Sequence, residues 1–159
     1  DFGLSRDTGL SLEEAREFIK TYFDLYQGVK IFRDKVIEEA RTRGYVKTLF
    51  RRKRFIPDLR STDKKRRNLS ERIAVNTIIQ GSAADLIKVA MNNIHAQLKK
   101  GSYEAKMLLQ IHDELLFEVH ESKLALTRFM VQEEMSHAVT LNIPIKVNIK
   151  TGKNWMETE

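Results

Sequence analysis

Apolar and polar positions alternate with the period of an α-helix through the first part of the chain. Apolar residues recur at spacings of three and four over residues 12–26 and again over residues 29–40. Ser11 and Glu14 have the spacing of a capping box ahead of the first run, and Gly44 follows the second. The pattern predicts two helices packed together through a short connection, the first starting at the box and the second ending at Gly44.

The next stretch changes to short β-prone runs. Residues 45–50 and 55–59 are two such runs, and four consecutive cationic residues separate them. These cationic residues are Arg51, Arg52, Lys53 and Arg54. The pattern predicts a β-hairpin with a cationic tip, and Pro57 restricts the second run to a sheet edge.

The remainder of the chain predicts a mixed helix and strand order. Residues 68–100 return to the helical period, and Gly81 inside them allows either one kinked helix or two helices. Strand-like runs at 106–111 and 115–119, a helical run at 121–139 and an alternating run at 144–149 follow. The second half is therefore ββαβ in outline, and the predicted fold class is α+β, with helices plus an antiparallel sheet.

Positive charge is concentrated in one segment. The 159 residues contain 28 Lys and Arg against 22 Asp and Glu, and 42% are apolar, which suffices for a core. Residues 41–72 hold thirteen of the basic and three of the acidic residues, so this segment carries +10 and the rest of the chain −4. The segment favours a polyanionic partner, although a short basic run is more often a solvated surface. The absence of cysteine excludes thiolate metal sites.

Three acidic or basic side chains interrupt the two apolar runs of the second half. His112, Asp113 and Glu114 lie between the runs and would form the tip of a hairpin. A solvated turn is the simplest interpretation of these residues. A two-residue turn, however, usually contains Asn-Gly or Asp-Gly, and neither is present here. Adjacent carboxylates repel each other, and a hard divalent cation such as Mg²⁺ or Mn²⁺ would offset that repulsion.

A second candidate site is a row of planar donor side chains on one helix face. Arg72, Asn76 and Gln80 are spaced by four residues and form one stripe. The DNA minor groove presents acceptors at every base pair in nearly equivalent places. The stripe could therefore check base-pair geometry, although it could also be a polar outer face.

Taken together, these motifs resemble the C-terminal part of the family A DNA polymerases, the bacterial DNA polymerase I family. The similar runs follow the family's order at residues 43–50, 52–58, 71–76, 80–85, 110–119 and 152–155. The resemblance implies a right-hand polymerase, of which this chain is a partial domain. Residues 1–100 would supply fingers-side helices, the basic hairpin and the fingers-to-palm helix, and residues 101–159 would supply a palm portion with the His-Asp-Glu hairpin.

The resemblance also implies roles for individual residues. Asp113 is similar to the second metal-binding aspartate of the family and Glu114 to its acidic neighbour, which makes both catalytic and metal-binding candidates. The DNA contacts of the family are matched by Arg72, Asn76, Gln80 and His112 at the primer terminus and minor groove, and by Arg51, Arg52, Lys53 and Arg54 at the duplex backbone. Primer–template DNA, deoxynucleoside triphosphates and two Mg²⁺ or Mn²⁺ ions are the implied partners, in a cytoplasmic, nucleoid-associated protein.

The chain departs from the family pattern in one large way and two small ones. No counterpart of the first metal aspartate or of the triphosphate-binding fingers helix is present, and the chain reads as cut from something longer. We therefore expect that it needs the upstream part of the same polymerase and that it does not extend a primer alone. Two smaller departures are Arg51, which stands where the family's hairpin often has glycine, and Thr77, which stands where the family pattern has proline.

Three alternatives remain open at the level of sequence. The chain could be a non-catalytic nucleic-acid-binding module derived from a polymerase, or a relative of the single-subunit RNA polymerases. A metal hydrolase is a third idea, which the lack of further ligand clusters disfavours. The Gln-Gly-Ser-Ala-Ala-Asp run at residues 80–85 and the Glu after His112-Asp113 favour the DNA enzyme.

Overall fold

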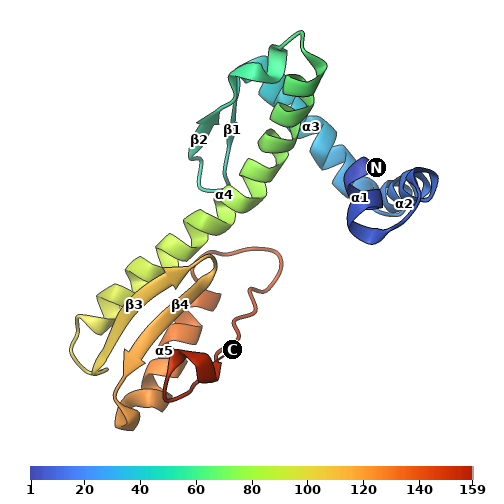
Figure 1. Cartoon of the computed structure of the whole chain (residues 1–159). Helices are drawn as coiled ribbons and strands as arrows, with labels where there is room; N and C mark the ends of the chain where they lie inside the picture. The colour runs from blue at the N-terminus through green and yellow to red at the C-terminus, as the bar shows by residue number, and fades with distance from the viewer. Residues whose placement is uncertain (159) are drawn as a thin grey trace. The chain divides into compact units, whose positions relative to one another are not determined.

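A computed structural model describes residues 1–158 of the chain, which divides into two compact units, Asp1–Ile79 and a second unit that begins at Gln80 (Figure 1). The α-helices are α1 (Phe2–Thr8), α2 (Leu12–Leu25), α3 (Gln27–Arg43), α4 (Lys64–Leu98) and α5 (Leu124–Ser136), and the strands are β1 (Tyr45–Lys47), β2 (Lys53–Phe55), β3 (Ala105–Ile111) and β4 (Glu114–Val119). Short 3₁₀ helices are η1 (Pro57–Arg60), η2 (Glu121–Lys123) and η3 (Trp155–Thr158). Helices with two antiparallel two-stranded sheets confirm the α+β class. No helix among residues 1–158 is long and apolar enough to cross a membrane.

The two predicted N-terminal helices are present as α2 and α3, and both ends that the sequence marked are formed. The Ser11 Oγ accepts the backbone N–H of Glu14 at 3.2 Å, and the Glu14 carboxylate accepts the backbone N–H of Ser11 at 2.8 Å. These hydrogen bonds satisfy donors that a helix start leaves unpaired. α3 ends at Gly44, whose φ of +76° is the left-handed conformation that glycine adopts without a Cβ clash.

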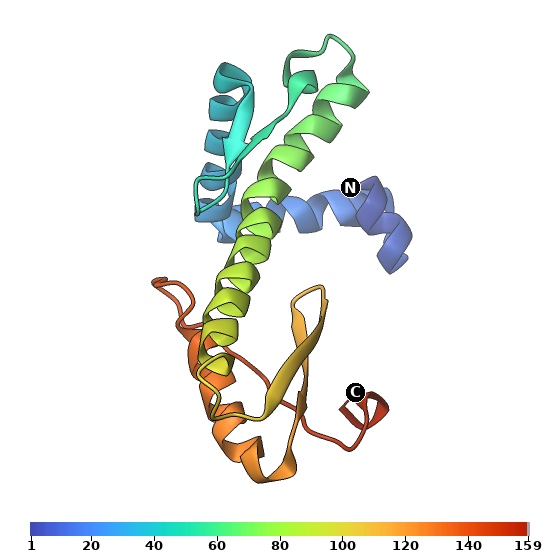
Figure 2. The same ribbon diagram turned by 90° about the vertical axis from the view of Figure 1, so that its left-hand side faces the viewer.

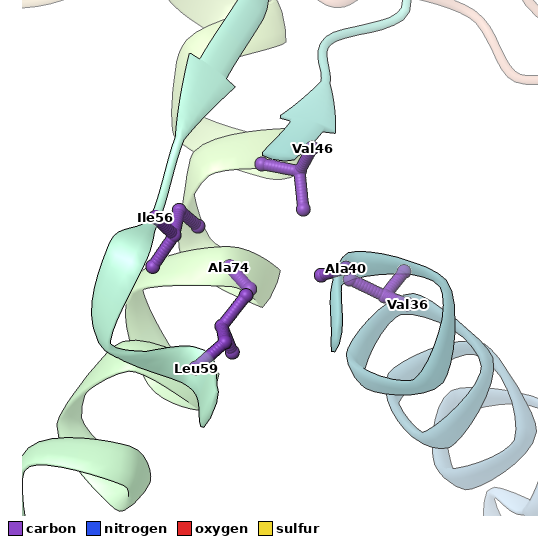
Figure 3. Close-up of a cluster of buried hydrophobic side chains, with 6 residues drawn as sticks. All are labelled: Val36, Ala40, Val46, Ile56, Leu59 and Ala74. Atoms are coloured by element: carbon purple, nitrogen blue, oxygen red, sulfur yellow. The ribbon is translucent and has the colours of Figure 1, made fainter. Parts of the chain in front are cut away.

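The core of the first unit lies where α3, the β1–β2 hairpin and α4 meet. It consists of Val36, Ala40, Val46, Ile56, Leu59 and Ala74 (Figure 3). Val46 points from β1 toward α3, and Leu59 from η1 is 1% exposed. Complete burial of a leucine side chain contributes about 2 kcal/mol, so the core fixes the hairpin and η1 against the two helices.

The predicted boundaries of the basic hairpin were wrong by several residues. β1 ends at Lys47 and the turn begins at Thr48, so Lys53 and Arg54 belong to β2 instead of the tip. The Arg51 N–H donates to the Thr48 carbonyl at 2.9 Å, which closes the turn around Leu49 and Phe50. Pro57 is the first residue of η1 and not a residue of an edge strand, because its fixed φ suits the start of a helix.

Residues 64–98 form one helix, α4, so of the two alternatives that Gly81 left open the structure excludes two separate helices. The helix begins at Lys64, four residues earlier than predicted, and passes Gly81 without interruption. A glycine inside a helix costs about 1 kcal/mol relative to alanine, which the buried residues on either side outweigh. Ala74 in the first unit and Ile94 in the second are both fully buried.

The second unit is a hairpin supported by two helices. β3 and β4 form an antiparallel hairpin (Figure 2). Their register shifts between Met107 and Leu109. Beneath β4 lies a buried cluster of Ile94, Met130 and Val131, which we name the second core. The predicted helix over residues 121–139 is present as η2 followed by α5.

The last predicted strand is not formed. Over residues 144–150, Ile145, Val147 and Ile149 are partly buried and the residues between them exposed, which is the alternation that predicted a strand. No β-ladder forms there, since neither sheet of the described chain extends to a third strand. Alternation alone predicts which side chains turn inward, whereas a strand also needs a hydrogen-bonding partner.

Candidate nucleic-acid interface and metal site

The acidic hairpin turns at His112 and Asp113. Ile111 lies opposite Glu114, so only two residues connect the strands, and Glu114 is the first residue of β4. His112 has a φ of +52°, and Asp113 is not among the residues with positive φ. This is the sign pattern of a type II′ turn, whose first position favours glycine. The Gln110 Nε2 donates to the His112 carbonyl at 3.0 Å and holds the turn from β3.

The packing beneath β4 fixes the base of this turn. Leu115 and Phe117, two residues apart on β4, are partly buried and pack against the second core. Asp113 and Glu114 are both exposed. Two carboxylates therefore stand at the end of a hairpin whose apolar side chains are held in place.

The carboxylate oxygens of the acidic hairpin are ligands of the type that a hard cation prefers. Mg²⁺ prefers about six oxygen ligands and is often bound by one or two carboxylates together with phosphates and water. Asp113 and Glu114 can supply such carboxylates. Within residues 1–158, however, no group of three or more His, Cys, Asp or Glu side chains gathers. The hairpin can thus hold part of one ion's coordination shell, and a two-ion site needs ligands from elsewhere.

The donor stripe lies on the solvent side of α4, as the sequence predicted. Arg72, Asn76 and Gln80 are exposed and follow one another at successive turns of the helix. The residues between them include Ala74 and Thr77, both buried. Across residues 1–158 the three side chains have no hydrogen bond or ion pair, so their planar donor groups are available to a ligand.

The first two residues of the stripe line an open groove between α3 and α4. Arg72 and Asn76 form its α4 side, and Arg33 and Arg41 contribute from α3. The Arg41 guanidinium pairs with the Glu71 carboxylate across the groove. This ion pair neutralises one acidic neighbour of Arg72 and leaves the Arg72 guanidinium as a cation at the edge of the groove.

The basic hairpin holds its cations in different ways. Arg51, Arg52, Lys53 and Arg54 are all exposed. Arg51 adopts a φ of +65° in the turn. Arg54 lies opposite Val46, on the face of β2 that turns toward the core, and its Nη1 donates to the Thr77 Oγ1 at 3.1 Å. Arg54 is therefore positioned against α4, one residue along the helix from Asn76.

The candidate residues are divided between the two units. The first unit holds the basic hairpin together with Arg72 and Asn76, and the second holds Gln80 and residues 112–114. The contact of Thr77 with Arg54 was not predicted from the sequence; Thr77 is buried, whereas its neighbour Asn76 is exposed. No local sequence signal could have found this contact, because the two residues lie 23 positions apart and meet only through the packing of the hairpin against α4.

Comparison with known proteins matches almost the whole chain to one family. The sequence profile of "DNA polymerase family A" matches residues 1–157. The DNA polymerase I of Caldicellulosiruptor bescii is 45% identical over 159 residues, which are all of this chain and 19% of that protein. The DNA polymerase I of Bacillus subtilis (strain 168) is 43% identical over the same length, covering 18% of that protein. The chain thus spans about a fifth of the length of these relatives.

A solved structure shows the same fold. It is described as the POL domain of Pol1 from M. smegmatis in complex with DNA primer-template and dNTP. The similarity has a TM-score of 0.94 and a sequence identity of 39%, and it covers 99% of this chain and 28% of that one.

Proposed function

The chain belongs to DNA polymerase family A, and from that membership we propose that it is a segment of a DNA-directed DNA polymerase, which adds deoxynucleotides to the 3′ end of a primer. The observation that carries the proposal is the match of all 159 residues to proteins named DNA polymerase I. The proposed substrates are primer–template DNA and deoxynucleoside triphosphates, the molecules named for the M. smegmatis complex.

In this proposal the acidic hairpin is the chain's contribution to the reaction centre. The Asp113 carboxylate, with Glu114 beside it, supplies part of the coordination shell of a divalent ion, preferably Mg²⁺ or Mn²⁺. Exposure of both side chains at a supported turn agrees with this role, because a metal ligand must reach solvent and substrate. The remaining ligands for a two-ion site come from the rest of the polymerase.

The proposed reaction is an in-line phosphoryl transfer. The primer 3′-oxygen forms a bond to the α-phosphorus of the triphosphate, the bond from that phosphorus to the bridging oxygen breaks, and pyrophosphate leaves with the electron pair. When bound, the two ions stabilise the attacking and leaving oxygens. The proton of the 3′-hydroxyl passes to solvent or to a nearby base. His112, at the turn beside Asp113, contacts the primer terminus in this proposal.

The stripe and the basic hairpin bind the duplex. Arg72, Asn76 and Gln80 donate to minor-groove acceptors, which occupy nearly equivalent places in correct base pairs. A mismatch displaces these acceptors, so the stripe favours extension of a correctly paired terminus. Arg51, Arg52, Lys53 and Arg54 bind backbone phosphates without sequence preference, and we expect this contact to weaken as salt rises.

A segment exchange tests the proposal directly. The matching segment of the Bacillus subtilis DNA polymerase I is replaced by these 159 residues, and primer extension is measured with labelled deoxynucleotides. We expect the exchanged polymerase to extend the primer and the isolated chain not to do so. A correctly folded exchange polymerase without activity would contradict the proposal and favour the non-catalytic module.

The same assay separates the DNA enzyme from a single-subunit RNA polymerase relative. The relatives' name, DNA polymerase I, favours the DNA enzyme. We therefore expect the exchanged polymerase to prefer deoxynucleoside over ribonucleoside triphosphates. The reverse preference, introduced by this segment alone, would support the RNA polymerase alternative.

A further inference from the structure

The outward face of the β1–β2 hairpin carries two aromatic rings and two lysines. In the antiparallel register Tyr45 lies opposite Phe55 and Lys47 opposite Lys53. Val46 alternates with them along β1, is 5% exposed and points into the core. Because neighbouring residues on a strand point to opposite faces, Tyr45, Lys47, Lys53 and Phe55 share the face turned away from the core. We call these four residues the aromatic–lysine face.

Their side chains contact one another closely. The Tyr45 and Phe55 rings meet edge to face with centroids 5.7 Å apart. The Lys53 Nζ lies 4.9 Å and the Lys47 Nζ 5.8 Å from the centroid of the Tyr45 ring. Across residues 1–158 neither lysine forms an ion pair with a carboxylate. The face is therefore aromatic and cationic, without a neutralising acid.

The second ring is left uncovered. Phe55 is 73% exposed, so it does not fill the apolar side of the hairpin. An exposed ring beside two ammonium groups offers an apolar surface and positive charge together, which suits a ligand that has both flat apolar faces and negative charge. Unpaired nucleotides have both, since each base presents a π-face and each linkage a phosphate.

We propose that the aromatic–lysine face binds single-stranded DNA, with a base stacked on Phe55 and adjacent phosphates bound by Lys47 and Lys53. The site lies on the opposite face of β2 from Arg54, which contacts α4. Bases within a duplex are already stacked on one another, so the face prefers an unpaired strand. The choice of DNA over RNA rests on the proposed function, in which unpaired template nucleotides are always present.

The proposal assigns Lys53 to an unpaired strand, whereas the proposed function places it on the duplex backbone with its neighbours. The two assignments differ in what removal of the bases does. A backbone contact binds an abasic strand as well as an ordinary one. A stacking site loses affinity when the bases are absent.

Binding of the 159-residue chain to labelled oligonucleotides, measured by fluorescence anisotropy, tests the site. The probes are an oligothymidylate of about twelve nucleotides, which spans one typical single-strand site, an abasic strand of equal length, and a duplex of equal length. Phe55→Leu removes the aromatic ring but keeps an apolar side chain, and Phe55→Trp keeps a stacking surface. Phe129→Leu, the same change at an exposed phenylalanine of α5, is the matched control. Circular dichroism checks that each variant is folded.

We expect Phe55→Leu to weaken oligothymidylate binding about tenfold, in the range of one stacked base. Phe55→Trp and Phe129→Leu should bind like the unchanged chain, and the abasic strand should bind equally weakly to all variants. The double substitution Lys47→Gln/Lys53→Gln should reduce the steepness of the plot of log affinity against log salt concentration by about 1.4. This is the value for two lost phosphate contacts on a single strand.

Equal oligothymidylate affinity of a folded Phe55→Leu chain and the unchanged chain would overturn the proposal. So would an equal loss on the abasic strand, because stacking cannot act without bases. If Phe55 does not affect binding, the exchanged polymerase can still extend a primer. If the exchanged polymerase is inactive, the 159-residue chain can still bind oligothymidylate through Phe55. The two proposals can therefore fail separately.

Discussion

The Arg54 Nη1 donates a hydrogen bond to the Thr77 Oγ1 over 3.1 Å and so connects strand β2 to helix α4. Thr77 is 6% exposed, whereas the Arg54 side chain as a whole is exposed. The contact fixes one end of a long flexible side chain and leaves the rest of it accessible. A cation positioned in this way loses less side-chain entropy when it binds a phosphate.

Thr77→Val should destabilise the chain by about 1 kcal/mol, because it removes the acceptor of a charged donor while keeping the shape of the side chain. The exposure of Arg54 keeps the cost at the low end of the range for such bonds, since water replaces part of the interaction. Urea unfolding measures the change. Thr62→Val, at an exposed position before α4, is the control and should shift the free energy of unfolding by less than about 0.5 kcal/mol.

A double-mutant cycle with Arg54→Ala isolates the contact. We expect a coupling energy of about 0.5–1 kcal/mol, within the range for residues in one hydrogen bond. Additive effects of the two substitutions would show that Thr77 stabilises α4 by other means and that Arg54 is not positioned by it.

Arg51→Gly should stabilise the hairpin by about 0.5–1 kcal/mol. Arg51 has a φ of +65°, where any residue with a Cβ is strained and glycine is not. The greater freedom of glycine in the unfolded chain offsets part of that gain. The same change at Lys53, inside β2, should instead destabilise, because strand backbone favours side chains with a Cβ. Thermal unfolding of the two variants gives opposite shifts if the turn geometry is the cause.

Local sequence signals predicted the elements whose cause is local. The Ser11–Glu14 box and Gly44 predicted α2 and the end of α3, and both are formed through backbone groups a few residues away. The apolar runs around residues 112–114 predicted β3 and β4, since each strand finds its partner across a short turn. The fourfold spacing of Arg72, Asn76 and Gln80 likewise predicted an exposed stripe.

Features that depend on distant partners were not predictable from the same signals. The alternation at residues 144–149 predicted a strand, but pairing requires a neighbour that the pattern does not reveal. The predicted tip of the basic hairpin was wrong because a run of four cationic residues suggests an exposed turn. The hydrogen bond from the Arg51 N–H to the Thr48 carbonyl closes the turn earlier in the chain. The contact of Arg54 with Thr77 joins residues 23 apart and has no local signature.

The stability of the chain should depend on pH through Glu14. Hydrogen bonds from Ser11, the side chain first and the backbone second, lower the pKa of Glu14 below its usual 4.5. A carboxylate with a lowered pKa in the folded state stabilises that state above its unfolded pKa, and the contribution disappears as pH falls through the folded pKa. Glu14→Gln should therefore reduce the acid sensitivity of the thermal midpoint between neutral pH and about pH 3, around the carboxylate range.

Ser11→Ala supplies the control for this titration. It removes the side-chain hydrogen bond, the largest cause of the lowered pKa. In a Ser11→Ala background, Glu14→Gln should change the pH profile less than it does in the unchanged chain. An identical change in both backgrounds would assign the pH dependence to other carboxylates.

Asn76→Ala in the exchanged polymerase should lower kcat/KM for primer extension about tenfold, the effect of one lost hydrogen bond of about 1.4 kcal/mol. If Asn76 donates to a purine N3 near the primer terminus, replacing that purine by its 3-deaza analogue removes the acceptor. The analogue should then slow the unchanged polymerase but not slow the Asn76→Ala variant further. Asn92→Ala, at another exposed position of α4, should leave both rates unchanged.

Asp113→Asn in the exchanged polymerase should reduce primer extension by at least about a hundredfold, because a metal ligand stabilises transition-state charge by several kcal/mol. The matched control is Glu118→Gln on strand β4 of the same hairpin, whose carboxylate is exposed and lies 3.9 Å from the Lys106 ammonium. An ion pair this exposed contributes at most about 1 kcal/mol, so the control should keep its activity. Weaker metal binding should also raise the Mg²⁺ concentration that Asp113→Asn needs for half-maximal extension. A folded Asp113→Asn polymerase with undiminished activity and an unchanged Mg²⁺ requirement would remove this aspartate from the metal site and leave the hairpin as an exposed turn.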